Sequence, residues 1–426
     1  MDKRFTRRDF IRTGTAAGVA AGLGSFARSQ EGAQPMRLGF IGTGGRGTYL
    51  LGLALGHPEV EVPALCDINE ANLNNAIALV RDKRGAAPEG YSAGPTDYRR
   101  LLERDDLEGV VVATPQNLHG PMAIDALHAG KHVLSEVSAA MELEHCWGLV
   151  RAQRESGKVY MLSENCCYYR QNMAVLNMVQ QGLFGDLTVA ECGYVHDCRA
   201  LMFNGDGSLT WRGEALARDY IGNLYPTHAI GPVAQWLGIN HGDRFESLVS
   251  FMTPERSITR YAAQRFGADS AAAKVPYACG DSTTTLLRTS KGVVVEIRYD
   301  VVSPRPVLST TYCTLQGTTA SWDDRDAVER IWVEGRSPEH TWKPAAPYVQ
   351  EFDHQLWREF GETASSAGHG GCDWFMVPQF LEAVRAGGPA PIDAVDAATW
   401  SAIIPLSAAS IRAGGPVEFP DFAAGA

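Results

Sequence analysis

A glycine-rich segment near the start of the chain carries the clearest chemistry. Residues 38–47 read LGFIGTGGRG, in which Gly42, Gly44 and Gly47 follow a short apolar strand and precede a predicted helix. Such a turn lets the backbone approach a pyrophosphate closely, and the N-terminus of the following helix supplies N–H donors. Asp67 closes the next predicted strand about 20 residues on, where a carboxylate binds the adenosine ribose and repels a 2′-phosphate. The pattern predicts a dinucleotide site and favours NAD over NADP.

The segments around this turn predict the fold. Strand-like and helix-like stretches alternate from residue 36 onward, and GVVVATP is the fully apolar strand typical of a parallel sheet. We therefore predict an α/β, doubly wound Rossmann domain over residues 36–164. Residues 165–426 are richer in β-branched strands, with loops at 199–224 and 334–352, and predict an α+β domain with a large, open, mainly antiparallel sheet. The C-terminal helix is expected to pack back towards the Rossmann domain.

The first 29 residues predict an export leader. An arginine pair in Thr6-Arg7-Arg8-Asp9-Phe10 precedes residues 13–27, a Gly/Ala-rich stretch shorter than the roughly 20 residues of a membrane span. We expect export of the folded protein by the twin-arginine (Tat) machinery to the periplasm or beyond, with no membrane anchor. An exported enzyme cannot replace NAD easily, so we expect the cofactor to be tightly bound and restored in every turnover.

Composition excludes other classes of function. The net charge of −11 argues against binding to nucleic acid or to an anionic membrane. The nine cysteines include no CxxC pair and show no zinc-ligand spacing, so we predict buried thiols and no metal site. We also expect a homo-oligomer, a dimer or larger.

Longer motifs, spread from residue 41 to residue 407, resemble glycoside hydrolase family 109. This family comprises NAD-dependent α-N-acetylgalactosaminidases and is a branch of the Gfo/Idh/MocA oxidoreductase superfamily. The matching segments are IGTGGRG, SEVSAAM, ENCCYYRQNMAVLNMVQQGLFG, GYVHDCR, NLYPTHAIGP, PRP at 304–306, AGHGGCDWF and WSAIIPLS. The resemblance implies an exported glycosidase acting on terminal N-acetylgalactosamine-type sugars.

Two departures separate this chain from the ordinary oxidoreductases of that superfamily. Those enzymes usually have Glu-Lys-Pro where this chain has Glu136-Val137-Ser138, so the lysine that assists hydride transfer is missing. They also have an aspartate four residues before a histidine, whereas Leu224 precedes His228 here. A third difference concerns the family itself: Val307 stands where an aromatic residue is expected after Pro-Arg-Pro, which leaves the accepted sugar open.

The resemblance also implies which residues line each site. The NAD site would comprise the glycine turn with Asp67 and residues from the following loops: Gly42, Gly44, Gly45, Arg46, Gly47, Asp67, Gln116, His119, Glu136, Val137, Asn165 and Tyr225. The sugar site would comprise Tyr194, Arg212, Tyr225, Pro226, Thr227 and His228. His369, between glycines, stands either on a loop that closes over substrate or in a plain turn.

A mechanism that leaves NAD unchanged overall fits these residues. Oxidation of the sugar at C3 acidifies the C2 proton, the C1 leaving group departs by elimination, water adds, and the hydride returns to C3. Proton transfer needs groups whose pKa lies near the working pH, which favours histidine and activated tyrosine. We expect His228 to be the base at the 3-hydroxyl. Tyr225 and Tyr168 are rival bases at C2, although a buried tyrosine that only donates a hydrogen bond is the alternative for each.

Other readings of the polar residues stay open. Glu136, Glu164 and Asp197 are acids that a paired-carboxylate glycosidase could use, but such an enzyme has no use for NAD. We therefore expect Glu136 and Glu164 near the nicotinamide or as hydrogen-bond partners. His196 and Asp197, with Arg199, either line the site or form an ion-pair cluster, and we favour the cluster.

Two other functions compete with the glycosidase. One is a sugar oxidoreductase with net reduction of NAD, and the other is a non-catalytic module that binds NAD or sugar. The sequence leaves the anomeric specificity open, because elimination and addition occur on either face of the ring.

Overall fold

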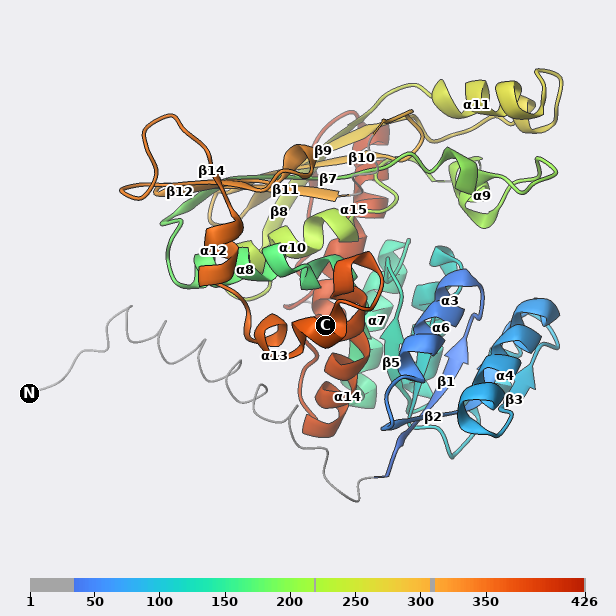
Figure 1. Cartoon of the computed structure of the whole chain (residues 1–426). Coiled ribbons are helices and arrows are strands. Elements are labelled where there is room, and N and C mark those ends of the chain that lie inside the picture. Colours follow the sequence, from blue (N-terminus) through green and yellow to red (C-terminus); the bar gives the residue numbers. More distant parts are fainter. Residues whose placement is uncertain (1–33, 218–219, 307–310, 425–426) are drawn as a thin grey trace, which may run out of the picture.

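The computed structural model describes residues 34–217, 220–306 and 311–424 (Figure 1). The predicted leader and Val307 lie outside these residues. The described residues form two sheets, one of six strands and one of nine, with helices packed between and around them. The α/β fold class predicted from the sequence is confirmed.

The first sheet is parallel throughout and has the strand order β3-β2-β1-β4-β5-β6. Its strands are β1 (Met36–Ile41), β2 (Val60–Cys66), β3 (Glu89–Tyr91), β4 (Gly109–Val112), β5 (His132–Ser135) and β6 (Tyr160–Leu162). Its helices are α3 (Gly45–Ala54), α4 (Glu70–Arg84), α5 (Tyr98–Leu102), α6 (Gln116–His128) and α7 (Leu143–Ser156). The strand order reverses between β1 and β4, and ligands of such sheets bind at the carboxyl ends of the strands beside that point.

The second sheet is mixed, with the order β14-β13-β12-β11-β7-β10-β9-β8-β15. Only the β7–β10 pairing is parallel among the pairings described in this sheet, so the predicted mainly antiparallel sheet is confirmed. The strands are β7 (Leu187–Val195), β8 (Phe245–Met252), β9 (Thr283–Thr289), β10 (Val294–Asp300), β11 (Thr311–Gly317), β12 (Ala320–Asp323), β13 (Arg330–Val333), β14 (Lys343–Pro344) and β15 (Val417–Glu418).

Helices cover the face of this sheet that looks towards the Rossmann domain (Figure 1). Helix α10 packs against β7 and β11, and α8 packs against α10. The helices of this part are α8 (Arg170–Gln180), α9 (Trp211–Ala217), α10 (Thr227–Leu237), α11 (Ser257–Phe266), α12 (Ala346–Glu351), α13 (Gln355–Ala364), α14 (Met376–Ala386) and α15 (Ala394–Ala413). Short 3-10 turns include η1 (Asn165–Tyr168), η2 (Arg199–Met202) and η5 (His369–Phe375).

Two stretches expected to be loops contain short regular elements. Residues 199–224 hold η2 and α9, and residues 334–352 hold β14 and α12. The Gly, Pro and Ser content of these stretches predicts loops, because the three helical elements are only one or two turns long and β14 is only two residues long. In α9 the buried positions are Gly213, Leu216 and Ala217.

Helix α15 joins the loops of the two domains. It packs against α7 and β6 of the Rossmann domain and against β8 of the second sheet. Ser401 Oγ accepts the N–H of Ala139, after β5, and Ser407 Oγ accepts the N–H of Asn223, each at 3.0 Å. Among the described residues, α15 is the one helix long and apolar enough to cross a membrane, and 78% of its apolar window is buried inside the protein. The predicted oligomer stays a prediction.

The glycine turn packs β1, α3 and β4 more closely than side chains permit. Gly42 has a φ of 91°, and a Cβ there would lie 2.6 Å from the Ala113 carbonyl oxygen. A Cβ on Gly47 would lie 2.0 Å from the Gly42 carbonyl oxygen. The first turn of α3 therefore rests directly on the end of β1.

Gly47→Ala is expected to lower the free energy of unfolding by about 1–3 kcal/mol, because the new methyl group must displace the β1–α3 turn. Gly52→Ala is the matched control: it lies in the same helix with no atom within 4 Å of the new Cβ, and alanine favours a helix by about 1 kcal/mol. Urea unfolding measures both. A Gly47→Ala variant as stable as the native protein would contradict the packing argument.

Candidate active site

Open space adjoins the start of α3. Gly44 and Gly45 leave open space: a Cβ on Gly45 would meet no atom within 4 Å, and one on Gly44 would come no nearer than 3.8 Å to Asn72. Gly44 caps α3 without a side-chain hydrogen bond, so the first N–H groups of α3 face this space. The turn therefore fits a pyrophosphate.

Asp67 directly follows β2 and is held in place by the glycine turn. Its Oδ2 accepts the Thr43 N–H at 2.7 Å, and its Oδ1 accepts the Asn69 N–H at 2.8 Å. The neighbouring Ile68 is 67% exposed, an unusual position for a large apolar side chain that sequence reasoning did not single out. The carboxylate and the apolar surface suit a ribose and an adenine ring respectively.

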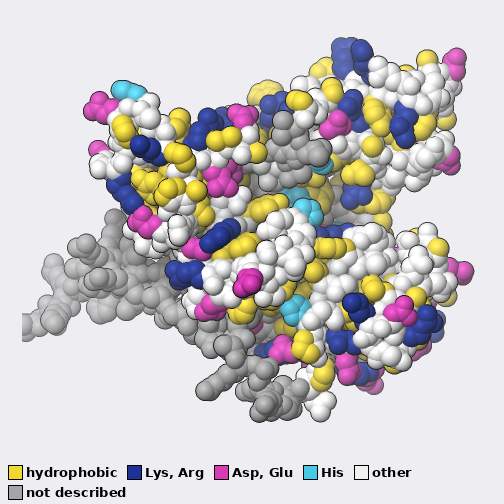
Figure 2. All heavy atoms as spheres, viewed as in Figure 1, with side chains coloured by type: hydrophobic (Ala, Val, Ile, Leu, Met, Phe, Trp, Pro, Cys, Tyr) yellow, Lys and Arg dark blue, Asp and Glu magenta, His cyan; other side chains and the backbone are white. Residues whose placement is uncertain are grey.

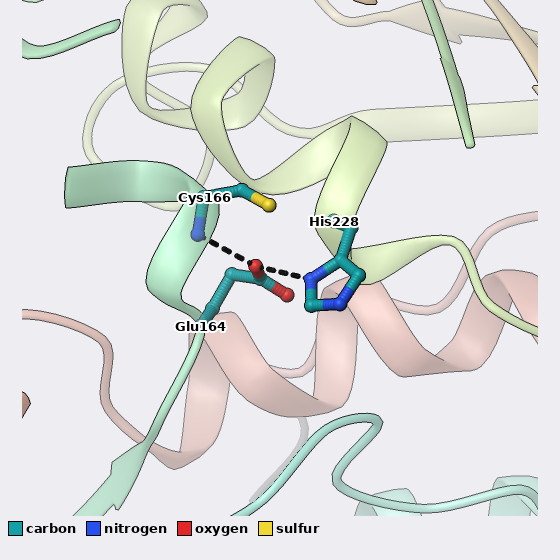
Figure 3. Close-up of side chains that lie close together, drawn as sticks. All are labelled: Glu164, Cys166 and His228. Carbon is teal, nitrogen blue, oxygen red and sulfur yellow. Dashed lines mark hydrogen bonds and ion pairs between the residues drawn. The ribbon is translucent and has the colours of Figure 1, made fainter. Parts of the chain in front are cut away.

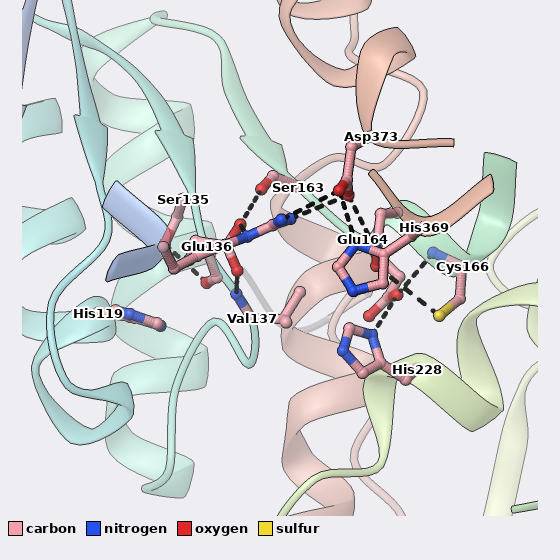
Figure 4. Close-up of polar contacts among 12 residues, drawn as sticks. His119, Ser135, Glu136, Val137, Ser163, Glu164, Cys166, His228, His369 and Asp373 are labelled. Atoms are coloured by element: carbon pink, nitrogen blue, oxygen red, sulfur yellow. Dashed lines mark hydrogen bonds and ion pairs between the residues drawn. The ribbon is translucent and has the colours of Figure 1, made fainter. Parts of the chain in front are cut away.

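A charge network crosses from the Rossmann domain to the second domain (Figure 4). Arg46, in the first turn of α3, donates from Nε to Glu136 Oε1 at 2.8 Å and from Nη1 and Nη2 to Asp373 at 3.3 and 3.2 Å. Asn165 Nδ2 donates to Asp373 Oδ1 at 2.8 Å, and His369 Nδ1 lies 2.6 Å from Asp373 Oδ2. Asp373 was missed from the sequence, although its position four residues after His369 in AGHGGCDWF was a usable clue.

Opposite charges set the ionisation of this network. Burial raises the pKa of Asp373, but the hydrogen bond from His369 and the charge of Arg46 outweigh it and lower that pKa to about 2. The same hydrogen bond raises the pKa of His369 against the effect of burial. Tyr49 adds a further link, since its hydroxyl accepts the Gly368 N–H at 2.7 Å and its ring lies under Arg46. The loop that carries His369 is thus held against α3.

His228 and Glu164 form a second buried pair (Figure 3). His228 follows the first residue of α10, and its Nδ1 lies 2.7 Å from Glu164 Oε1. The Glu164 side chain is fully buried, and His228 is 17% exposed. Burial raises the pKa of Glu164, whereas the charge and hydrogen bond of His228 bring it below the ordinary value. An ionised Glu164 fixes the proton on Nδ1 and leaves Nε2 as the acceptor.

Cys166 completes a compact trio with these two residues, and the ligand-type atoms lie within 4.8 Å of one another. The Cys166 N–H already donates to Glu164 Oε1 at 3.0 Å, and its Sγ lies 3.7 Å from Asn165 Oδ1. Burial raises the pKa of the Cys166 thiol well above its usual value, so the sulfur keeps its proton. The trio is organised as a hydrogen-bonded group around one carboxylate oxygen.

An aromatic wall adjoins His228. The ring centroids of Tyr225 and His228 lie 4.9 Å apart, and those of Tyr194 and Tyr225 lie 5.2 Å apart. Tyr194, Tyr225 and Arg212 line one cavity of about 130 Å³. The structure thus brings together most of the sugar-site residues expected from the sequence. Pro226 and Thr227, both buried, start α10 directly behind this wall.

Other expected residues lie behind the site. Tyr168 is 4% exposed and stacks on Phe375, and its hydroxyl has no hydrogen-bond partner among the described residues. Burial raises its pKa. His119 is also buried, with its ring nitrogens 2.9 and 2.8 Å from the Ser138 and Thr114 carbonyl oxygens, so it joins the loops after β4 and β5.

Gln116 and Val137 lie at the Rossmann edge of the site. Gln116 Nε2 donates to the Leu224 carbonyl at 2.8 Å, which ties the start of α6 to the loop before Tyr225. Val137, at the position of the missing lysine, is 4% exposed.

Asp197 and Arg199 form the ion pair expected of them, at 2.7 Å. The guanidinium of Arg199 also lies 5.0 Å from the centre of the Tyr261 ring. We favoured an ion-pair cluster that includes His196, but His196 instead lines the cavity of Tyr194 and Tyr225. Burial lowers its pKa.

Asp373→Asn is expected to lower the free energy of unfolding by about 3 kcal/mol at neutral pH, because Arg46 and His369 lose a buried carboxylate. The pKa of Asp373 falls from 3.8 to about 2 on folding, so its contribution is present above the unfolded pKa and is lost as pH falls. The stability difference between native and variant protein should therefore shrink as pH is lowered from about 4 to about 2, between the unfolded and folded pKa values. Urea unfolding at each pH measures it.

Asp82→Asn is the control for that series, because the Asp82 side chain is 71% exposed in a surface ion pair and such pairs contribute little. A difference for Asp373→Asn that stays constant with pH would refute the assigned ionisation.

Comparison with known proteins identifies the family of both domains. A family model described as glycosyl hydrolase 109, C-terminal domain, matches residues 168–426, and one described as oxidoreductase family, NAD-binding Rossmann fold, matches residues 36–164. A glycosyl hydrolase family 109 protein of Stenotrophomonas maltophilia is 40% identical over 99% of this chain and 96% of its own length. A protein of Tannerella forsythia named alpha-N-acetylgalactosaminidase is 35% identical over 99% of this chain and 97% of its own.

Solved structures share the fold at lower identity. Levoglucosan dehydrogenase in complex with NADH superposes with a TM-score of 0.68 at 20% identity, over 91% of this chain and all of that one. The resemblance drawn from the sequence motifs is confirmed by the family models and the curated relatives. The chain belongs to glycoside hydrolase family 109 and joins the C-terminal domain of that family to an NAD-binding Rossmann domain.

Proposed function

We propose that this protein is an NAD-dependent glycosidase that removes terminal N-acetylgalactosamine-type sugars and leaves its NAD unchanged overall. The observation that carries the proposal is the Glu164–His228 pair, packed against Tyr225 in the wall of the cavity, with Val137 in place of a lysine. The substrate class follows the name of the Tannerella forsythia relative. Export by the Tat machinery belongs to the same proposal, because a captive cofactor suits an exported enzyme.

His228 acts as the base at the sugar 3-hydroxyl in this proposal. Ionised Glu164 holds the Nδ1 proton, so Nε2 takes the hydroxyl proton and returns it at the end of the cycle. Bound NAD supplies a reversible hydride acceptor for C3 of the sugar. Glu164 is held by burial and by the Cys166 N–H, which keeps the pair aligned through both half-reactions.

Tyr225 is the better placed of the two candidate bases at C2. It lines the cavity and packs edge-on against His228, whereas Tyr168 is buried against Phe375. Burial raises the pKa of Tyr225, and the nearby charge of Arg212 acts in the opposite direction. Loss of the C2 proton expels the group at C1, and water then adds to the ring before the 3-keto group is reduced again.

The network around Asp373 holds the cofactor end of the site. Arg46 and Glu136 form an ion pair next to the glycine turn, and Asp373 pairs with His369. We propose that Gly44, Gly45 and Asp67 hold NAD by its pyrophosphate and ribose, with Gln116, Glu136 and Asn165 nearer its reactive ring. These residues bind and position NAD and do not themselves oxidise or reduce it.

Purified protein is expected to carry about one NAD per chain and to cleave an aryl α-N-acetylgalactosaminide without added cofactor. Denaturation followed by an enzymatic NAD assay measures the content, and absorbance of the released aryl group measures the turnover. NADH should not accumulate, and added NAD should not raise the rate. NADH accumulating in step with substrate would instead make the protein a sugar oxidoreductase.

His228→Ala is expected to lower kcat/KM by about 10²–10⁴, the usual contribution of a general base, with the NAD content unchanged. Glu164→Gln leaves His228 in place but removes the charge behind it, so a smaller loss in kcat is expected. His128→Ala, whose side chain is 53% exposed on the surface, is the matched control. Full activity of His228→Ala would refute its role, and loss of NAD from that variant would indicate a structural one.

A further inference from the structure

Three side chains of different ligand type meet at the start of α10. Cys166 Sγ, a carboxylate oxygen of Glu164 and a ring nitrogen of His228 all lie within 4.8 Å of one another, and in Figure 3 they point towards one another. Glu164 and Cys166 belong to the start of η1, whereas His228 lies 64 positions after Glu164. Because the chain brings these residues together from a distance, the spacing of the cysteines predicted no metal site.

One carboxylate oxygen of this trio lacks a partner. Glu164 Oε1 accepts the Cys166 N–H at 3.0 Å and lies 2.7 Å from His228 Nδ1. Glu164 Oε2 is buried and makes no hydrogen bond among the described residues. A buried carboxylate oxygen without a partner is costly, and a bound cation removes that cost.

The three ligand types select the cation. Sulfur, imidazole nitrogen and carboxylate oxygen are the ligands of Zn²⁺, at about 2.0–2.3 Å, whereas Ca²⁺ and Mg²⁺ take oxygen ligands and more of them. Ligand atoms of a tetrahedral zinc site lie about 3.5 Å apart, so side-chain shifts of about 1 Å close the trio on the ion. A dipositive ion also balances one thiolate and one carboxylate, which leaves the buried site neutral.

His228 is the member of the trio that solvent reaches. Its side chain is 17% exposed, and its ring packs against Tyr225 in the wall of the cavity described above. This cavity is lined by Gln116 of α6 and by Trp211 and Arg212 of α9. Figure 2 shows the surface hollowed between the Rossmann domain and the projecting part that carries α9 and α11 in Figure 1. A cation therefore approaches the trio from this hollow.

We propose that Glu164, Cys166 and His228 form an inhibitory site for Zn²⁺. The ion binds Cys166 Sγ, Glu164 Oε2 and His228 Nδ1, and the thiol proton is released to solvent. The single proton of the neutral imidazole then lies on Nε2, because the metal occupies Nδ1. Nε2 has no free lone pair in this state, so His228 does not accept a proton from a sugar hydroxyl. The loss of activity rests on the proposed function, whereas the metal site itself does not.

The first test titrates the purified protein, freed of metal by a chelator that is then removed, with Co²⁺. This ion takes the place of Zn²⁺, and a thiolate–Co²⁺ bond absorbs in the near ultraviolet. The absorbance should saturate at one Co²⁺ per chain, and Zn²⁺ should abolish it. Cys166→Ser and Cys166→Ala should both remove it. Cys167→Ser is the matched control and should keep it, because Cys167 is the neighbouring residue and is equally buried, at 4% exposed.

The second test measures cleavage of an aryl α-N-acetylgalactosaminide with and without Zn²⁺. Zn²⁺ should inhibit the native protein, and excess EDTA should restore the rate, with the bound NAD unchanged throughout. A residue that only supports a metal ligand contributes about 10–100-fold to metal affinity, and a ligand contributes at least as much. Cys166→Ser should therefore need at least about tenfold more Zn²⁺ for half-inhibition of its own metal-free rate. Cys167→Ser should respond like the native protein.

Other outcomes overturn the inference. A native protein without the thiolate–Co²⁺ absorbance, or an absorbance that persists in Cys166→Ser, would refute the site. Equal inhibition of native protein and Cys166→Ser would place the inhibitory ion elsewhere, and release of NAD by Zn²⁺ would refute the effect through His228. A metal-free protein that cleaves no glycoside would instead refute the proposed function, and the Co²⁺ titration would still decide the metal site.

Discussion

The buried carboxylate of Asp373 is the contact on which the arrangement of the site depends. It receives hydrogen bonds from α3 of the Rossmann domain, from η1 and from its own loop, through Arg46, Asn165 and His369. A fully buried carboxylate is costly unless it is paired and hydrogen-bonded. Three separate segments donate these hydrogen bonds. If any of them moved away, the carboxylate would lose a hydrogen bond while still buried, at a cost in free energy. Asp373 therefore ties the glycine turn to η1 and to the loop that carries His369.

Helix α15 fixes the opposite side of the same junction by neutral contacts. Its serines accept backbone N–H groups from the loop after β5 and from the segment before Tyr225. A helix hydroxyl that accepts a backbone N–H from another segment positions that segment without any charged group. The site thus lies between an ionic clamp at Asp373 and an uncharged one at α15, and Gln116 adds a third link to the Leu224 carbonyl.

Local patterns in the sequence were sufficient for the fold and for the cofactor turn. The strand–glycine–helix order, the apolar run of β4 and the acid after β2 each depend on neighbours in the chain, so periodicity and turn chemistry revealed them. The residues missed were those whose partners are distant in sequence. Asp373 lies 327 positions from Arg46, and only its spacing from His369 hinted at a partner. Tyr49 likewise resembles an ordinary core aromatic in the sequence, because the Gly368 N–H that its hydroxyl accepts is 319 positions away.

The two buried acid–histidine pairs differ in a way that suits two different tasks. Glu164 accepts the Cys166 N–H and lies 2.7 Å from His228 Nδ1, so in the proposed function the pair shares one proton and the outer nitrogen of the ring exchanges a proton with the sugar. The hydrogen bond from His369 and the charge of Arg46 lower the pKa of Asp373 and keep it ionised, and the same hydrogen bond raises the pKa of His369. A general base works best when its partner keeps its pKa near the working pH. A carboxylate that only holds charge in place is instead kept ionised by several neighbouring positive groups or hydrogen-bond donors. The first arrangement adjoins the aromatic wall of Tyr194 and Tyr225, and the second adjoins the glycine turn. In the proposed function this division keeps proton transfer at the first pair apart from the fixed charge at the second.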